Sequence, residues 1–134
     1  MTAGRRVAPP SGMPPPSVAT LPDGTAVELR PLAQSIADAH LRRHPEDVER
    51  YGADLARDWC THDHQHVLAW AAGDIDLDGQ LAWLARVLGA RGYPVANLID
   101  SLDTAAQTLE RELATDAARE VSDRLRAAAA RLRR

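Results

Sequence analysis

Apolar side chains recur every three or four residues between Pro94 and Leu113, and this period constrains the fold more than any other feature of the sequence. The stripe consists of Val95, Leu98, Ile99, Leu102, Ala106, Leu109 and Leu113. Positions three and four apart share one face of an α-helix, which has about 3.6 residues per turn. The segment is therefore predicted to be an amphipathic helix that buries this face against other helices.

Proline and glycine divide the preceding chain into further helices. Proline suits the first turn of a helix, where its missing N–H has no partner to lose, and glycine suits the left-handed position just after a helix end. With these signals the predicted helices span residues 31–44, 45–73, 79–91 and 94–113. The expected fold class is all-α, a bundle of four or five helices over residues 31–134.

The last helix is predicted to be separate, although no glycine or proline divides it from the one before. The apolar register breaks after Leu113, and Thr115 or Asp116 can cap a new helix over about residues 116–133. Its own face would consist of Val121, Leu125, Ala128 and Leu132. We expect this helix to be peripheral to the bundle, and the last two helices could also form a dimer interface.

Residues 1–30 are predicted to be a disordered, proline-rich arm. Six of the nine prolines lie in this stretch, and its apolar surface is too small to offset the entropy lost on ordering. A turn over 21–24 and a short extended piece over 25–29 are the exceptions that its residues suggest. A tail or linker is favoured over a polyproline ligand, because no PxxP motif has a basic anchor.

Charge excludes general binding to polyanions, since the chain has a net charge of −3. Residues 31–116 contain seven Arg against fifteen Asp and Glu, whereas residues 117–134 contain six Arg against two acids. The basic end lacks interleaved aromatic side chains, so nucleic acid is not the expected partner. There is no membrane-spanning run or signal-peptide core, and a single cysteine, Cys60, suits a bacterial cytoplasmic protein.

The stretch from 45 to 73 holds three of the five histidines and two of the three tryptophans. Wound as one helix, it gathers an inward stripe with a candidate ligand-binding set of Trp59, His62, Asp63, His66 and Trp70. His64 would lie on the opposite face, in water. Imidazoles beside a carboxylate could sense pH or a small ligand, although buried histidines that only complete a core remain the simpler reading.

A metal or haem site is the alternative for the same histidines. His40 and His44 are four residues apart, as are His62 and His66, and such pairs lie on one helix face. Two pairs on neighbouring helices could hold zinc, iron or haem. The spacing matches no specific metalloprotein motif.

Asp74, Asp76 and Asp78 precede a glycine in a pattern that matches the first half of an EF-hand calcium loop. The bidentate glutamate expected at the twelfth position is Ala85. Weak calcium binding is thus a second alternative, and an acidic loop whose Asp78 caps the next helix is the simpler one.

No set of residues in the sequence makes a convincing catalytic site. Cys60 and His62 are two apart, and side chains at that spacing diverge on a helix. Together these observations favour a non-enzymatic regulatory, sensory or protein-interaction module whose partner is another protein or a second copy of itself.

The sequence also resembles a helical domain that is common in bacteria. The residues that carry the resemblance are Arg50-Tyr51-Gly52, then Cys60, Asp63, His66 and Leu68, then Trp83-Leu84 and Arg91-Gly92-Tyr93-Pro94. Helical modules of this appearance stand beside ligand-binding or signalling domains, including cobalamin-binding ones. The resemblance brings no settled activity, and it implies a sensory role exerted between proteins.

Overall fold

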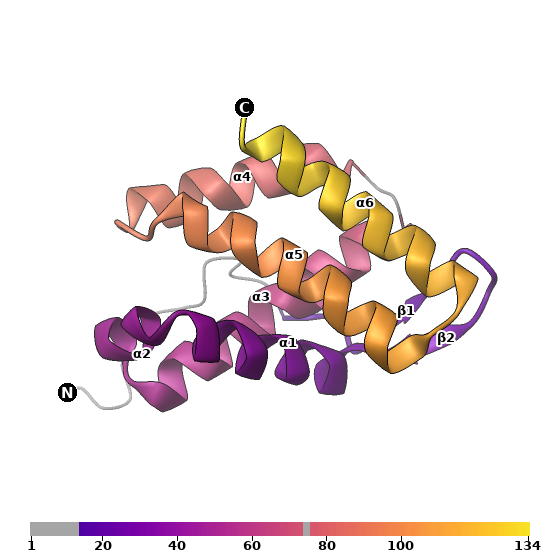
Figure 1. Ribbon diagram of the computed structural model, residues 1–134, viewed down its shortest axis with the longest axis horizontal. Helices are drawn as coiled ribbons and strands as arrows, with labels where there is room; N and C mark the ends of the chain where they lie inside the picture. The colour runs from indigo at the N-terminus through magenta and orange to yellow at the C-terminus, as the bar shows by residue number, and fades with distance from the viewer. Residues whose placement is uncertain (1–13, 74–75) are drawn as a thin grey trace.

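A small β-hairpin followed by six helices makes up the described part of the chain in the computed structural model, which describes residues 14–73 and 76–134 (Figure 1). The elements are β1 Val18–Thr20, β2 Ala26–Glu28, α1 Leu29–Arg43, α2 Pro45–Tyr51, α3 Ala53–Gly73, α4 Leu77–Ala90, α5 Val95–Leu113 and α6 Asp116–Leu132. The all-α class is confirmed. Four of the predicted helices match α1, α4, α5 and α6 to within two residues at each end.

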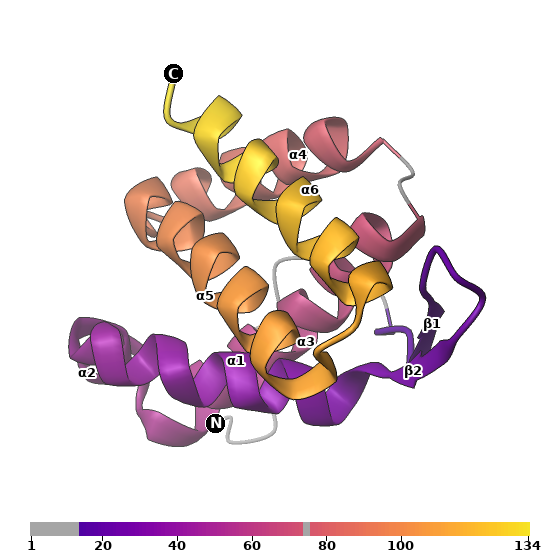
Figure 2. The same ribbon diagram turned by 45° about the vertical axis from the view of Figure 1, so that its right-hand side comes forward.

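α5 and α6 lie side by side and run in opposite directions (Figures 1 and 2). Thr115 caps α6 as predicted, because its hydroxyl accepts a hydrogen bond from the Ala118 N–H at 3.1 Å. Small, fully buried residues such as Ala106 and Ala118 line the contact, which lets the Ser122 hydroxyl reach the Ala106 carbonyl at 3.0 Å. Val121 and Leu125 join the core, so α6 is not peripheral.

The arginines of the last helix bind acidic and carbonyl groups of the other helices. Arg124 donates to the carbonyls of Ala71 and Ala72 at the end of α3, where the last turn leaves its acceptors unpaired. Three more arginines pair with acids of α4 and α5: Arg126 with Glu110, Arg131 with Asp78 and Arg133 with Asp103. The excess of arginine at the end of the sequence is thus explained by the packing of the basic α6 segment against acidic residues of α4 and α5.

The hairpin lies inside the range predicted to be disordered. β1 and β2 pair antiparallel, with Ala19 opposite Val27, and the flanking Leu21 and Leu29 are buried in the core cluster. The apolar surface that receives them comes from distant helices, and local sequence cannot reveal it. Residues 1–13, the rest of the predicted arm, lie outside the described residues.

A single glycine splits the predicted helix over 45–73 into α2 and α3. Gly52 has φ 83° and ψ 153°, a conformation that side chains with a Cβ avoid. The split resets the helical register, so the predicted stripe does not continue from α2 into α3. α3 contacts α1, α2, α4, α6 and β1. These neighbours cover more than one face of α3.

No helix in residues 14–73 and 76–134 is long and apolar enough to cross a membrane.

We expect Gly52→Ala to lower the free energy of unfolding by about 1–3 kcal/mol, because alanine must adopt a conformation that only glycine tolerates. Gly89→Ala is the matched control. Gly89 lies inside α4, and a Cβ there would meet only Val95 Cγ2 at 3.9 Å, so alanine should be neutral or stabilising by up to about 1 kcal/mol. Urea unfolding of both variants checks this, and equal effects would contradict the assignment of strain to Gly52.

Candidate functional site

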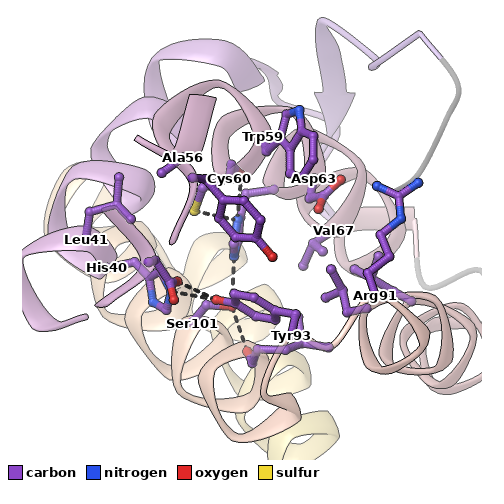
Figure 3. Close-up of a pocket in the computed structure, with 16 residues that line it drawn as sticks. His40, Leu41, Ala56, Trp59, Cys60, Asp63, Val67, Arg91, Tyr93 and Ser101 are labelled. Atoms are coloured by element: carbon purple, nitrogen blue, oxygen red, sulfur yellow. Dashed lines mark hydrogen bonds and ion pairs between the residues drawn. The ribbon is translucent and has the colours of Figure 1, made fainter. Parts of the chain in front are cut away.

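A cavity of about 60 Å³ lies where α1 to α5 meet (Figure 3). Its wall is largely apolar, with Trp59 and Val67 from α3, Leu84 and Leu88 from α4 and Leu98 from α5. Among these side chains lie polar groups from five segments: His40, Asp47, Cys60, Asp63, His64, Arg91, Tyr93 and Ser101. An apolar hollow with a few convergent polar groups is the usual form of a small-molecule site.

Asp47 accepts hydrogen bonds from three side chains on one side of the cavity. Tyr93 donates its hydroxyl at 2.6 Å, Asn97 donates its amide at 3.1 Å, and His40 Nε2 lies 3.2 Å away. Burial alone raises the pKa of the Asp47 carboxyl, but the bonds from His40 and Tyr93 outweigh it, and the net shift is downward. Burial and the bond to Asp47 raise the pKa of Tyr93. The network therefore holds an ionised carboxylate that the protein satisfies.

Asp63 presents the opposite case on α3. Asp63 is 9% exposed, and its Oδ1 atom has no hydrogen-bond partner among the described residues; the Nδ1 atom of His62 lies 3.6 Å from it, at ion-pair distance. Figure 3 draws the Asp63 carboxylate between the Trp59 ring and the Arg91 side chain. A buried acceptor without a donor lowers the stability of a protein by about 1–3 kcal/mol. The Asp63 Oδ1 atom can therefore still accept a hydrogen bond from a bound molecule.

His64 is 4% exposed, and the prediction that it faces water is wrong. Its Nδ1 lies 2.8 Å from the Cys60 carbonyl and its Nε2 lies 3.1 Å from the Ser101 hydroxyl. The carbonyl can only accept, so Nδ1 carries the hydrogen. Burial lowers the pKa of His64 to about 4. The ring is thus a neutral part of the cavity wall at pH 7.

The predicted ligand set is divided by the structure. Trp59 and Asp63 line the cavity, whereas His62, His66 and Trp70 form a ladder of rings elsewhere along α3. The ring centroids of His62 and His66 are 5.2 Å apart, and those of His66 and Trp70 are 5.8 Å apart. The prediction did not include Asp47 or Tyr93, which reach the cavity from α2 and from the connection between α4 and α5.

The four histidines of the predicted metal or haem site do not converge. His40 and His44 instead meet Asp100 of α5, and one ligand atom from each of the three lies within 4.8 Å of the others; this is the cluster of potential metal ligands within residues 14–73 and 76–134. His44 Nε2 is 2.6 Å from Asp100 Oδ2, and Arg43 donates to both Asp100 oxygens. The pKa of His44, which burial alone would lower, is raised by Asp100 and Glu46.

Two of the three aspartates in the predicted calcium loop have structural partners. Asp76 caps α4, with the Gly79 N–H 3.3 Å from its Oδ1, and Asp78 pairs with Arg131 at 2.8 Å. Asp76, rather than Asp78, is therefore the cap of this helix. Asp74 lies outside the described residues.

Cys60 is arranged as a structural thiol rather than a nucleophile. Its Sγ is 3.5 Å from His64 Nδ1, but that nitrogen donates to the Cys60 carbonyl. Desolvation raises the pKa of the Cys60 thiol, while it lowers the pKa of the histidine. Both shifts oppose a thiolate–imidazolium pair, the form that nucleophilic cysteines use.

Comparisons of the chain with protein-family models, with curated proteins and with solved structures gave no match. The resemblance to a bacterial helical domain gains no support from them, and the function must be argued from the chemistry of the site.

The two buried carboxylates should respond differently to the same substitution. Asp47→Asn should lower the free energy of unfolding by about 3–5 kcal/mol, because it removes the charge that satisfies two buried donors and one half-buried donor. Asp63→Asn should be neutral or stabilising, since the lost charge had an unpartnered oxygen. Denaturant unfolding measures both, and an equal loss in Asp63→Asn would show that protein groups already satisfy Asp63.

His64 should make stability depend on pH. The unfolded ring binds a proton below about pH 6.5, whereas the folded ring stays neutral down to about pH 4. The neutral His64 ring therefore costs no stability above about pH 6.5. As the pH falls from 6.5 to 4, the free energy of unfolding decreases by about 1.4 kcal/mol per pH unit, and below about pH 4 His64 causes no further change.

His64→Asn removes the proton site and keeps an amide near the position of Nδ1, so unfolding curves across this range should show a shallower pH slope than the wild type. Identical slopes in wild type and His64→Asn would contradict a neutral buried ring.

Proposed function

We propose that this protein is a non-enzymatic regulatory module. In the cavity where helices α1 to α5 meet, it binds a small, partly apolar molecule that carries a hydrogen-bond donor. The observation that carries the proposal is the buried Asp63 oxygen without a donor. The lone cysteine and the arginine-only basic composition fit a bacterial cytoplasmic setting.

The wall chemistry selects the ligand class. The aromatic and aliphatic side chains favour an alkyl body, and Asp63 favours an N–H or O–H donor, an ammonium most of all, because hydrogen bonds to charged groups are the stronger ones. Asp47 binds Tyr93 and Asn97, and His64 binds Cys60 and Ser101. Two wall atoms have no hydrogen-bond partner among the described residues, His40 Nδ1 and Asp63 Oδ1, and of these only the carboxylate oxygen can carry a negative charge. Asp63 is thus the anchor for the ligand.

The cavity volume limits the size of the ligand. A cavity of about 60 Å³ is less than half of the roughly 150 Å³ that accommodates benzene in an engineered protein core. A ligand with a few heavy atoms and a branched alkyl group fits this volume better than an aromatic one. Arg91 is exposed at the edge of the cavity, 5.8 Å above the Trp59 ring.

The position of α2 gives the bound ligand a route to a partner protein. α2 contributes Asp47 and Tyr51 to the cavity wall, and the Tyr51 ring contacts Trp59 at a centroid distance of 5.2 Å. Gly52 alone joins α2 to α3. A ligand that displaces Tyr51 therefore moves α2 and changes the surface that a partner would read, while α3 stays intact.

Isobutylammonium, isobutanol and isobutyrate are matched probes that differ in the polar group. By calorimetry, one equivalent of isobutylammonium should bind, and it should shift the NMR resonance of the Trp59 indole. Isobutanol should bind more weakly, and isobutyrate should not bind. Asp63→Asn should weaken ammonium binding at least tenfold, given about 1.5–3 kcal/mol for a charged hydrogen bond. Asp54→Asn, an exposed aspartate on the same helix, is the control.

Two results would overturn the proposal. One is the absence of saturable ammonium binding by the folded protein. The other is binding that Asp63→Asn and Asp54→Asn leave equally strong, or a preference for isobutyrate, since either would remove Asp63 as the anchor.

A further inference from the structure

We propose that His40, His44 and Asp100 form a binding site for a divalent transition-metal ion of the zinc class. The site joins the last turn of α1 to α5 and lies next to the cavity, with which it shares only His40. It goes beyond the proposed function, because it requires no ligand in the cavity and does not involve Asp63.

The three side chains already face one another. His40 and His44 are one helical turn apart with ring centroids at 4.6 Å, and their candidate ligand atoms and that of Asp100 lie within 4.8 Å of one another. Zinc bonds of about 2.0–2.2 Å in a tetrahedral site require somewhat closer donor atoms. Rotation of the side chains about an ion can close that difference, and three protein donors leave a fourth position for water.

Each histidine has one ring nitrogen bound to a carboxylate outside the cluster. His40 Nε2 lies 3.2 Å from Asp47 Oδ2, and His44 Nδ1 lies 2.9 Å from Glu46 Oε2. The Asn97 amide donates to both carboxylates, at 3.1 Å and 3.2 Å. Histidines that ligate metals nearly always donate their other N–H to a carboxylate or carbonyl in this manner, which fixes the ring and directs the free nitrogen at the metal.

The nitrogen that remains on His40 has no hydrogen-bond partner among residues 14–73 and 76–134. His40 is 2% exposed, and its Nδ1 atom is buried without a hydrogen bond. With Nε2 donating to Asp47, the neutral ring has a lone pair at Nδ1, which is the form that a metal binds. A buried nitrogen without a hydrogen-bond partner, on a residue that belongs to the cluster with His44 and Asp100, is the second observation that points to an ion, and it is independent of the spacing.

The local charge also fits a divalent cation. Asp47, Glu46 and Asp100 contribute three negative charges, and Arg43 contributes one positive charge. With neutral histidines the balance is −2. Arg43 binds Asp100 through both oxygens, but its side chain is 57% exposed, and such surface pairs contribute only about 0–1 kcal/mol. An ion can therefore displace it, together with the hydrogen that His44 and Asp100 share.

The test uses the full chain, freed of metal with a chelator and titrated with zinc or cobalt alone. We expect one equivalent to bind, with the visible absorption of four-coordinate cobalt(II). His44→Ala and Asp100→Asn should each weaken binding at least a hundredfold, and Asn97→Ala should weaken it about 10–100-fold through the carboxylates that it orients. Circular dichroism confirms that each variant is folded.

His62→Ala and His66→Ala are the matched controls, because they remove the other histidine pair and should leave the affinity unchanged. Asp63→Asn should also leave it unchanged, which separates this site from the cavity ligand. Binding that survives both His44→Ala and Asp100→Asn, binding lost in His62→Ala, or no stoichiometric binding by the folded protein would each overturn the proposal.

Discussion

The Asp47 carboxylate connects α2 to three other segments of this small helical protein. It lies on α2, accepts from Tyr93 beyond the end of α4 and from Asn97 on α5, and contacts His40 on α1. Asp47 is the buried residue of α2, so this network is the main attachment of that helix. A buried charge is costly unless it is fully hydrogen-bonded, and here the partners come from segments that only the correct fold brings together.

The same network separates two chemically different neighbours. On one side is the cavity, where the Asp63 Oδ1 atom accepts no hydrogen bond from the described residues. On the other side is the cluster of His40, His44 and Asp100, where Asp47 and Glu46 hold the rings. In both places the protein satisfies its supporting groups and leaves one acceptor open, which is the arrangement expected of preorganised binding sites.

Local signals in the sequence predicted the helices well. The three-four spacing from Val95 to Leu113 and the cap at Thr115 needed no knowledge of the tertiary structure, and α5 and α6 follow them. The site was harder to predict, because a helical wheel assumes one buried face. α3 is packed on several sides, so His64 is buried although it is opposite the predicted stripe. The helix also breaks at Gly52, so Tyr51 does not share a helical face with the rest of that stripe. Asp100 sits 56 residues from His44, a pairing for which a single sequence contains no signal.

Ligand binding in the cavity requires Asp63, and not Asp47, to be the carboxylate that accepts the ligand's hydrogen bond. The side-chain carboxyl ¹³C resonances of the two residues, followed by NMR during titration with isobutylammonium, test it most directly. The Asp63 resonance should move with the binding isotherm, while that of Asp47 should stay within the range seen with added salt. A saturable shift of Asp47 with no change at Asp63 would contradict it.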